Sequence, residues 1–234
     1  DFVASRRTTR DFLPTPVPQE LIDTLLTDAM TAPSWSNTRP YLIATAQGEV
    51  RDRISKEFLA RWEQASKALG GGFLGKAKLF LTRYGLPTSD YKVNRVYPKV
   101  LQPRSARVGA ELYALLGIDR KDQKARQAQW ARNYEFFGAP VSFFIFTHSG
   151  LGEYSVSDAG LFMQNLMLSA HAHGLGTCAQ GASAVWADAV RAEFDVPEGY
   201  KLLCGIALGY PSDHKVNGFQ ADRLPISDIK LKTK

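Results

Sequence analysis

The sequence predicts a single domain that combines α-helices with a β-sheet. Apolar residues recur at three-and-four spacing from about 18 to 31 and from about 49 to 68, which is the period of an amphipathic helix. Two other segments, 141–146 and 201–211, have the β-prone apolar composition of buried strands. The 234 residues contain neither an internal repeat nor a low-complexity linker, so residues 1–234 are expected to form one domain.

Composition and charge restrict the class of protein. Apolar residues make up 44% of the chain, and no apolar run reaches the roughly 18 residues of a membrane span, so we expect a globular protein without a membrane segment. The net charge of +6 permits an anionic ligand. Basic residues are nevertheless scattered among acidic ones, which argues against binding of nucleic acid. The densest basic region, Arg120–Arg132, is interpreted as the solvent-facing side of a helix.

The cysteines and histidines lack the spacing of a metal site. Cys178 and Cys204 stand alone, without a CxxC pattern. His171 and His173 are two residues apart, which places them on different sides of a helix, and the other two histidines are isolated. No metal is therefore predicted. The unpatterned thiols, together with an N-terminus that lacks the layout of a signal peptide, predict reduced cysteines and a cytoplasmic location.

The first half of the chain is predicted to contain two helices and a strand. The helix at 18–31 begins where Pro18 suits the first helical turn and stops before Pro33. A run of turn formers from 33 to 40 then leads into a strand at 41–45. The helix at 49–68 follows.

The glycine-rich run Gly70–Ala77 looks like a phosphate-binding P-loop. That motif needs Ser or Thr where Ala77 stands, and a strand ahead of it where a helix is predicted. We therefore interpret the run as a flexible glycine turn. Residues 79–97 show no clear pattern, and the role of residues 79–103 is left open; helices are predicted at 104–116 and 120–133, joined by Gly117.

The second half begins with the buried strand at 141–146. A helix capped by Ser155 or Ser157 is expected to continue to residue 172. It is apolar on two sides, which indicates burial in a large core or against a second subunit. The small residues 177–182 allow a ligand to approach the backbone closely, and Ser183 is expected to cap a helix that ends near Phe194.

A compact set of anion-binding groups lies near the start of the chain. Three arginines and two threonines fall between residues 6 and 10. The guanidinium group is a planar fork that matches phosphate oxygens, and hydroxyls add further donors. Charged residues at a chain start are also often simply solvated, so this pattern by itself leaves both interpretations open.

Four segments in order resemble the FMN-dependent nitroreductases and together cover nearly the whole chain. They are Ser5–Phe12, Ala32–Tyr41, Gly174–Gly181, and Gly205–Pro211 followed by Arg223–Pro225. The resemblance implies an α+β fold, a nitroreductase-like sandwich in which helices flank a central mixed or antiparallel β-sheet. It also implies an intertwined homodimer with flavin sites at the interface, which the apolar helix ending at 172 would suit.

The resemblance also implies roles for individual residues. Arg6 and Arg223 would hold the flavin phosphate, Thr8 would bond the phosphate or the ribityl chain, and Arg10 would reach the pyrimidine edge. The other subunit would place the loop at 33–37 onto the ring, and the backbone at 179–181 would face the flavin. The implied cofactor-binding residues are Arg6, Arg7, Thr8, Arg10, Pro33, Ser34, Trp35, Asn37, Ala179, Gln180, Gly181 and Arg223.

The implied activity is that of an NAD(P)H-dependent nitroreductase. A hydride passes from NAD(P)H to flavin N5 and then to a small aromatic acceptor, which gives ping-pong kinetics. The protein contributes no acid or base to the first step, so no catalytic residue is named. The segments 113–118 and 133–140 look like the nitrobenzoate-reducing branch, and Trp35 and Arg39 would give a cationic, aromatic pocket for flat anionic acceptors.

Two alternatives remain open at this point. A flavoprotein on the same scaffold could reduce quinones, enones or free flavin. The basic charge is also compatible with a binding module that carries no flavin and performs no reaction.

Overall fold

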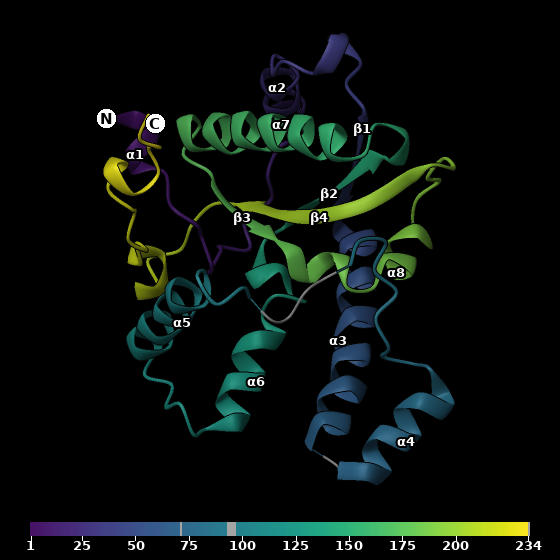
Figure 1. Cartoon of the computed structure of the whole chain (residues 1–234). Helices are drawn as coiled ribbons and strands as arrows, with labels where there is room; N and C mark the ends of the chain where they lie inside the picture. Colours follow the sequence, from purple (N-terminus) through teal and green to yellow (C-terminus); the bar gives the residue numbers. More distant parts are fainter. Residues whose placement is uncertain (71, 93–96, 234) are drawn as a thin grey trace.

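The structure is a computed structural model that describes residues 1–70, 72–92 and 97–233 (Figure 1). The helices are α1 (Phe2–Ser5), α2 (Gln19–Ala29), α3 (Gly48–Gly70), α4 (Gly72–Thr82), α5 (Gln102–Leu116), α6 (Gln123–Ala131), α7 (Glu153–Ala172) and α8 (Ala187–Arg191), and the strands are β1 (Tyr41–Gln47), β2 (Val141–His148), β3 (Gly176–Gln180) and β4 (Tyr200–Gly209). Both chain ends lie on the same side of the molecule.

The described strands form one antiparallel sheet in the order β1-β2-β4-β3. Strand β2 is central and buried along nearly its whole length, as its apolar composition predicts. The edge strand β3 also forms an isolated parallel bridge between Thr177 and Thr8. The first residues of the chain therefore lie along the edge of the sheet.

Helices cover both faces of the sheet, and each interface holds a core. Helices α2 and α7 pack on one face, where Leu25 and Phe162 are fully buried, and α3 and α8 pack on the other face, where Phe58 and Trp186 are buried (Figure 1). The predicted α+β sandwich is confirmed, and its sheet is antiparallel. The helices predicted at 18–31 and 49–68 correspond to α2 and α3.

Two predicted helix caps are wrong. Helix α7 begins at Glu153, because Gly152 with a φ of 53° turns the chain there. Ser155 is buried inside the helix and donates its hydroxyl hydrogen to the carbonyl of His148 at 2.7 Å, and Ser157 is likewise inside the helix. Ser183 lies in a 3₁₀ turn, η4 (Gly181–Ala184), ahead of the short helix α8.

The predicted glycine turn is also wrong over most of its length. The backbone from Gly72 to Thr82 is helical, and Gly71 lies outside the described residues. A glycine costs a helix about 1 kcal/mol relative to alanine, which good helix formers on either side offset. Gly117 does join two helices as predicted, with a φ of 74° at the end of α5.

The described helices include none that is long and apolar enough to cross a bilayer. Within the same residues, no group of three or more His, Cys, Asp or Glu side chains could hold a metal ion. His148 and His214 each accept a hydrogen bond from a backbone amide two residues later, so both have local structural roles.

Candidate functional site

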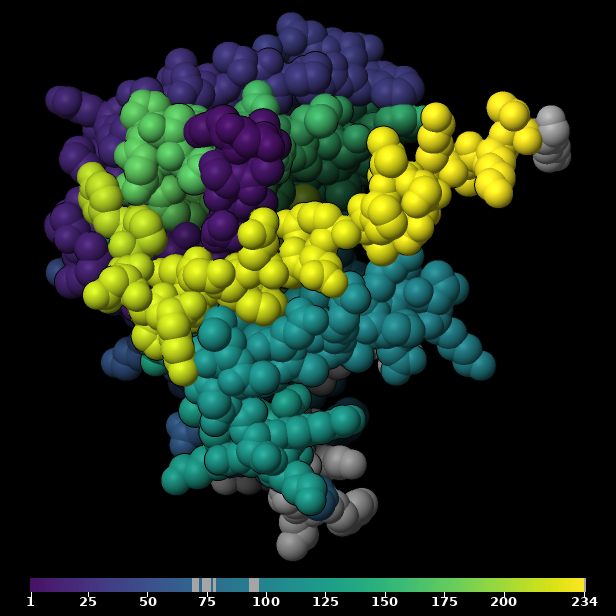
Figure 2. Space-filling view, turned by 90° about the vertical axis from the view of Figure 1, so that its left-hand side faces the viewer, coloured from purple at the N-terminus to yellow at the C-terminus, as the bar shows by residue number. Residues whose placement is uncertain are grey.

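Residues from the two ends of the chain line one small hollow. Figure 2 shows this face of the molecule, where the N-terminal residues, the C-terminal segment and helix α5 lie side by side. The hollow has a volume of about 50 Å³. Its lining consists of Arg6, Arg7, Thr8, Arg10, Val108, Phe219, Gln220, Ala221 and Arg223. All four sequence-predicted residues of the N-terminal segment are therefore brought together with Arg223.

Pairing with the sheet edge fixes the N-terminal side of the hollow. The amide of Thr9 donates to the carbonyl of Thr177 at 2.9 Å, and the Thr9 side chain is buried. Side chains alternate along an extended segment, so Arg6, Thr8 and Arg10 point away from the side that Thr9 takes. This alternation directs two guanidinium groups and one hydroxyl toward the hollow. Arg7 does not follow the alternation and reaches the lining through its bond to Gln220.

The hollow carries uncompensated positive charge. Arg7 donates to the side-chain oxygen of Gln220, and Arg223 donates to the carbonyls of Ala221 and Asp222 at 2.8 and 3.2 Å. Within the described part of the chain, no carboxylate forms an ion pair with any of the four lining arginines. Four cations without acidic partners attract an anion, and guanidinium groups fit phosphate best.

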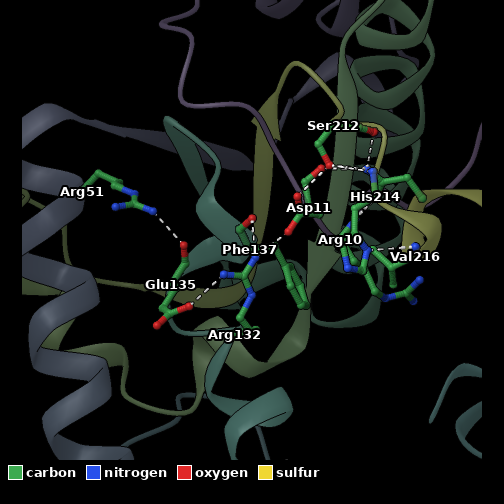
Figure 3. A network of polar contacts seen from close by, with 10 residues as sticks. Arg10, Asp11, Arg51, Arg132, Glu135, Phe137, Ser212, His214 and Val216 are labelled. Carbon is green, nitrogen blue, oxygen red and sulfur yellow. Dashed lines mark hydrogen bonds and ion pairs between the residues drawn. The ribbon is translucent and has the colours of Figure 1, made fainter. Parts of the chain in front are cut away.

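The sequence patterns did not predict a network of polar contacts that lies next to the hollow (Figure 3). Asp11 accepts from Arg132 at 2.9 Å and from the hydroxyl of Ser212 at 2.6 Å. Asn217 accepts from the amide of Arg10 at 2.8 Å. The prediction that Arg132 is only a solvent-facing charge is wrong, because Arg132 is half-buried and paired with both Asp11 and Glu135. Apart from the local pair of Arg132 with Glu135, these partners are far apart in sequence, so no local pattern marks them.

The end of β3 continues the site beyond the arginines. Ala179 and Gly181 are exposed, whereas Gln180 is buried and donates from Nε2 to the carbonyl of Asn133 at 2.9 Å. The side-chain oxygen of Gln180 has no partner among the described residues. Arg10 lies close enough to act electrostatically on Cys178, one residue before Ala179. Two accessible residues at and just after the end of β3, Ala179 and Gly181, thus follow the buried Cys178 on which Arg10 acts.

The loop with Pro33, Ser34, Trp35 and Asn37 lies elsewhere in the same protomer. The Trp35 amide donates to the Asp158 carboxylate at 3.0 Å, and the centre of the Trp35 ring lies 4.1 Å from that of the Tyr154 ring. Tyr154 and Asp158 both belong to the first two turns of α7. The N-terminal segment instead meets the far end of α7, where Ser5 bonds His171 at 2.7 Å. Helix α7 has 20 residues, which is about 30 Å at 1.5 Å per residue. Within a single protomer, this loop and the hollow therefore lie at opposite ends of α7 (Figure 1).

This loop is held in a strained conformation. Ser36, Asn37 and Arg39 have φ values of 46°, 58° and 45°, which non-glycine residues rarely adopt. The Ser34 hydroxyl accepts from the Arg39 amide at 3.0 Å and helps to hold the turn. Strain of this kind costs of order 1–3 kcal/mol per residue and is concentrated at functional sites. Trp35 remains 51% exposed, available to a neighbouring surface.

Burial predicts that both thiols are unreactive in the native protein. It raises the pKa of Cys178 to about 11, although nearby Arg10 lowers it in part, and it raises the pKa of Cys204 to about 12. The thiolate is the nucleophile, so at pH 8 neither cysteine should react with a disulfide reagent until the protein unfolds. The thiol of an unfolded chain ionises near pH 9.0, so stability should fall with pH from there upward. If the native protein at pH 8 reacted rapidly with a chromogenic disulfide reagent, the prediction that both thiols are unreactive would be wrong.

An α+β sandwich with a cationic hollow beside its sheet edge is typical of a protein that binds a phosphate-bearing cofactor. The chain belongs to the nitroreductase family, whose family model matches residues 3–210. The family predicted from the four sequence segments is therefore confirmed.

The chain is also similar to individual proteins of this family. Nitroreductase NfnB from Mycolicibacterium smegmatis is 33% identical over 227 residues, which are 97% of this chain and 88% of that protein. A 4-nitrobenzoate reductase from Pseudomonas putida is 33% identical over 222 residues, which are 94% and 89% of the two chains. The crystal structure of the FMN-dependent nitroreductase NfnB from Mycobacterium smegmatis in complex with NADPH is 31% identical, with a TM-score of 0.84 and coverage of 100% and 96%.

Proposed function

We propose that this protein is an FMN-dependent NAD(P)H oxidoreductase that reduces nitroaromatic compounds. The cationic hollow formed by Arg6, Arg10 and Arg223 is the observation that carries this proposal, because it supplies what a flavin phosphate requires. Relatives that are about one-third identical are named as nitroreductases and as a 4-nitrobenzoate reductase. Family membership argues against a flavin-free binding module. The cytoplasmic location and the single domain over residues 1–234 stay predictions. Cys178 and Cys204 form no disulfide with each other, as expected for reduced thiols.

The chain's own residues would bind and orient the cofactor. Arg6 and Arg223 hold the phosphate, and the Thr8 hydroxyl bonds the phosphate or the ribityl chain. Arg10 places positive charge near Ala179, the exposed residue of β3, where the pyrimidine edge would lie, and the backbone at 179–181 would face the ring. When bound, FMN supplies the hydride chemistry, accepting a hydride from NAD(P)H and passing it to the acceptor in ping-pong order.

A second copy of the chain would complete the site. A hollow of about 50 Å³ accommodates a phosphate end but is far below the roughly 300–1,000 Å³ of a typical ligand pocket. The loop at 33–37 lies at the opposite end of α7, so it cannot cover a ring bound beside the arginines of its own chain, and the corresponding loop of a partner would do so. Exposed apolar side chains on α7 and the C-terminal segment, Leu161, Ile229 and Leu231 among them, support a homodimer.

The purified protein should show the visible spectrum of bound FMN. We expect anaerobic NADPH or NADH to bleach it and 4-nitrobenzoate to restore the oxidised spectrum. Quinone, enone and free-flavin acceptors form the comparison panel, and faster turnover with any of them than with nitroaromatics would shift the assignment to that class. A protein that binds no FMN after reconstitution would overturn the proposal.

A further inference from the structure

Four residues from the two chain ends form a connected set of hydrogen bonds, which we call the terminal clasp: Arg10, Asp11, Ser212 and Asn217. Asn217 uses both atoms of its side-chain amide. Its oxygen accepts from the Arg10 amide at 2.8 Å, and its nitrogen donates to the carbonyls of Asp11 at 2.8 Å and Ser212 at 3.0 Å. One side chain therefore bonds segments that are more than 200 residues apart.

Asp11 closes the clasp from the N-terminal side. Its carboxylate accepts from the Ser212 hydroxyl at 2.6 Å and from Arg132 at 2.9 Å, and its carbonyl accepts from the Ser212 amide at 3.1 Å (Figure 3). Hydrogen bonds to charged groups are stronger than those between neutral groups. The exposed pair between Arg107 and Asp222 at 3.0 Å contributes much less to holding the C-terminal segment.

Apart from Arg10, the residues of the clasp lie beside the hollow without lining it. Among the described residues, Asp11, Ser212 and Asn217 are absent from the hollow's lining. Arg10, however, belongs to the clasp and also lines the hollow. Phe219 and Gln220, two and three residues after Asn217, line the hollow as well. The backbone of the C-terminal segment passes from the clasp directly to Arg223.

Little regular structure otherwise fixes this C-terminal segment. After β4 ends at Gly209, the described segment contains short 3₁₀ turns and no further helix or strand pairing beyond the bridge of Phe12 with Pro211. Ordering a free backbone costs conformational entropy at every residue, so a site built on a loose segment binds weakly. Bonds that order the segment in advance recover that cost as affinity.

We infer that Asn217 is a positioning residue, which holds the two chain ends together so that Arg6 from one end and Arg223 from the other converge on one phosphate. This inference rests on the proposed function. The Arg10 segment is also held by the bond of the Thr9 amide to Thr177, so loss of Asn217 should act mainly on the convergence of Arg6 and Arg223, and therefore on ligands that carry the phosphate. Riboflavin, which has the same ring and ribityl chain without the phosphate, separates this role from general support of the fold.

The test is a pair of titrations on the apoprotein, with FMN and with riboflavin, followed by flavin fluorescence. For Asn217→Ala we expect the Kd for FMN to rise about tenfold, the equivalent of losing one good hydrogen bond. The Kd for riboflavin should change less than twofold. Ser212→Ala removes the hydroxyl bond to Asp11 and the weaker bonds that the hydroxyl accepts from His214 and Asn217. It should weaken FMN binding in the same direction by two- to fivefold, roughly half of that energy. Ser66→Ala, an exposed serine on α3, is the matched control.

The outcomes are distinguishable. Equal weakening of FMN and riboflavin in both variants, or unchanged FMN binding, would overturn the positioning role. If Asn217→Ala does not fold, Ser212→Ala decides by the same comparison. A parent protein that binds FMN no more tightly than riboflavin would instead overturn the phosphate site itself, and the inference with it.

Discussion

Replacing Arg6 or Arg223 by alanine should weaken FMN binding by roughly 10- to 100-fold, because each variant loses charged hydrogen bonds worth about 1.5–3 kcal/mol. The two side chains reach the hollow from opposite ends of the chain and have no carboxylate partner among the described residues, so no local ion pair competes for them. Equilibrium dialysis of the apoprotein in low-phosphate buffer measures the effect, since inorganic phosphate competes for the same cations.

A lysine substitution and added salt distinguish the effect of positive charge on FMN affinity from the effect of guanidinium geometry. Arg223→Lys keeps the positive charge but loses the planar fork, so its FMN affinity should lie between that of the parent and that of Arg223→Ala. Added salt should weaken the parent more than the alanine variants. Arg120→Ala, an exposed arginine away from the hollow, removes the same formal charge and should leave affinity nearly unchanged. If Arg6→Ala retains FMN as tightly as the parent, its assigned role is wrong.

The periodicity of the chain predicted most of the fold. Helix α2 and strand β2 were predictable because a single local pattern, amphipathic in one and continuously apolar in the other, determines each. Caps were less predictable. Ser155 resembles an N-cap in the sequence, yet the turn at Gly152 starts α7 two residues earlier and leaves Ser155 buried.

The site was predictable only in part, and for a different reason. A resemblance of ordered segments linked Arg6 to Arg223, since neither periodicity nor composition relates residues at opposite chain ends. Asn217 had no such signal, because its partners Arg10 and Asp11 lie 207 and 206 residues away. An isolated asparagine in a polar loop is common, and only the folded geometry shows that it bonds both ends.

The substitution Gly176→Ala should damage both stability and FMN binding. A Cβ at Gly176 would lie 2.3 Å from the Thr9 hydroxyl oxygen and 2.8 Å from its Cβ and Cγ2. Thr9 is short, branched and buried, so it cannot swing aside. Overpacking of this kind costs about 1–3 kcal/mol, which lowers the Tm of a chain of this length by roughly 2–12 °C. Differential scanning fluorimetry and FMN titration measure the two effects.

Loss of FMN affinity should accompany the loss of stability because the same contact positions the arginines. The Thr9 amide bonds Thr177 at 2.9 Å, and separating Thr9 from β3 moves Arg6, Thr8 and Arg10 with it. The double variant Thr9→Gly with Gly176→Ala removes the clash, so its destabilisation should be smaller than the sum of the two single effects. Gly109→Ala on α5, where a new Cβ meets nothing within 4 Å, should be neutral or stabilising. Full FMN affinity in Gly176→Ala would show that the arginines are placed without this edge contact.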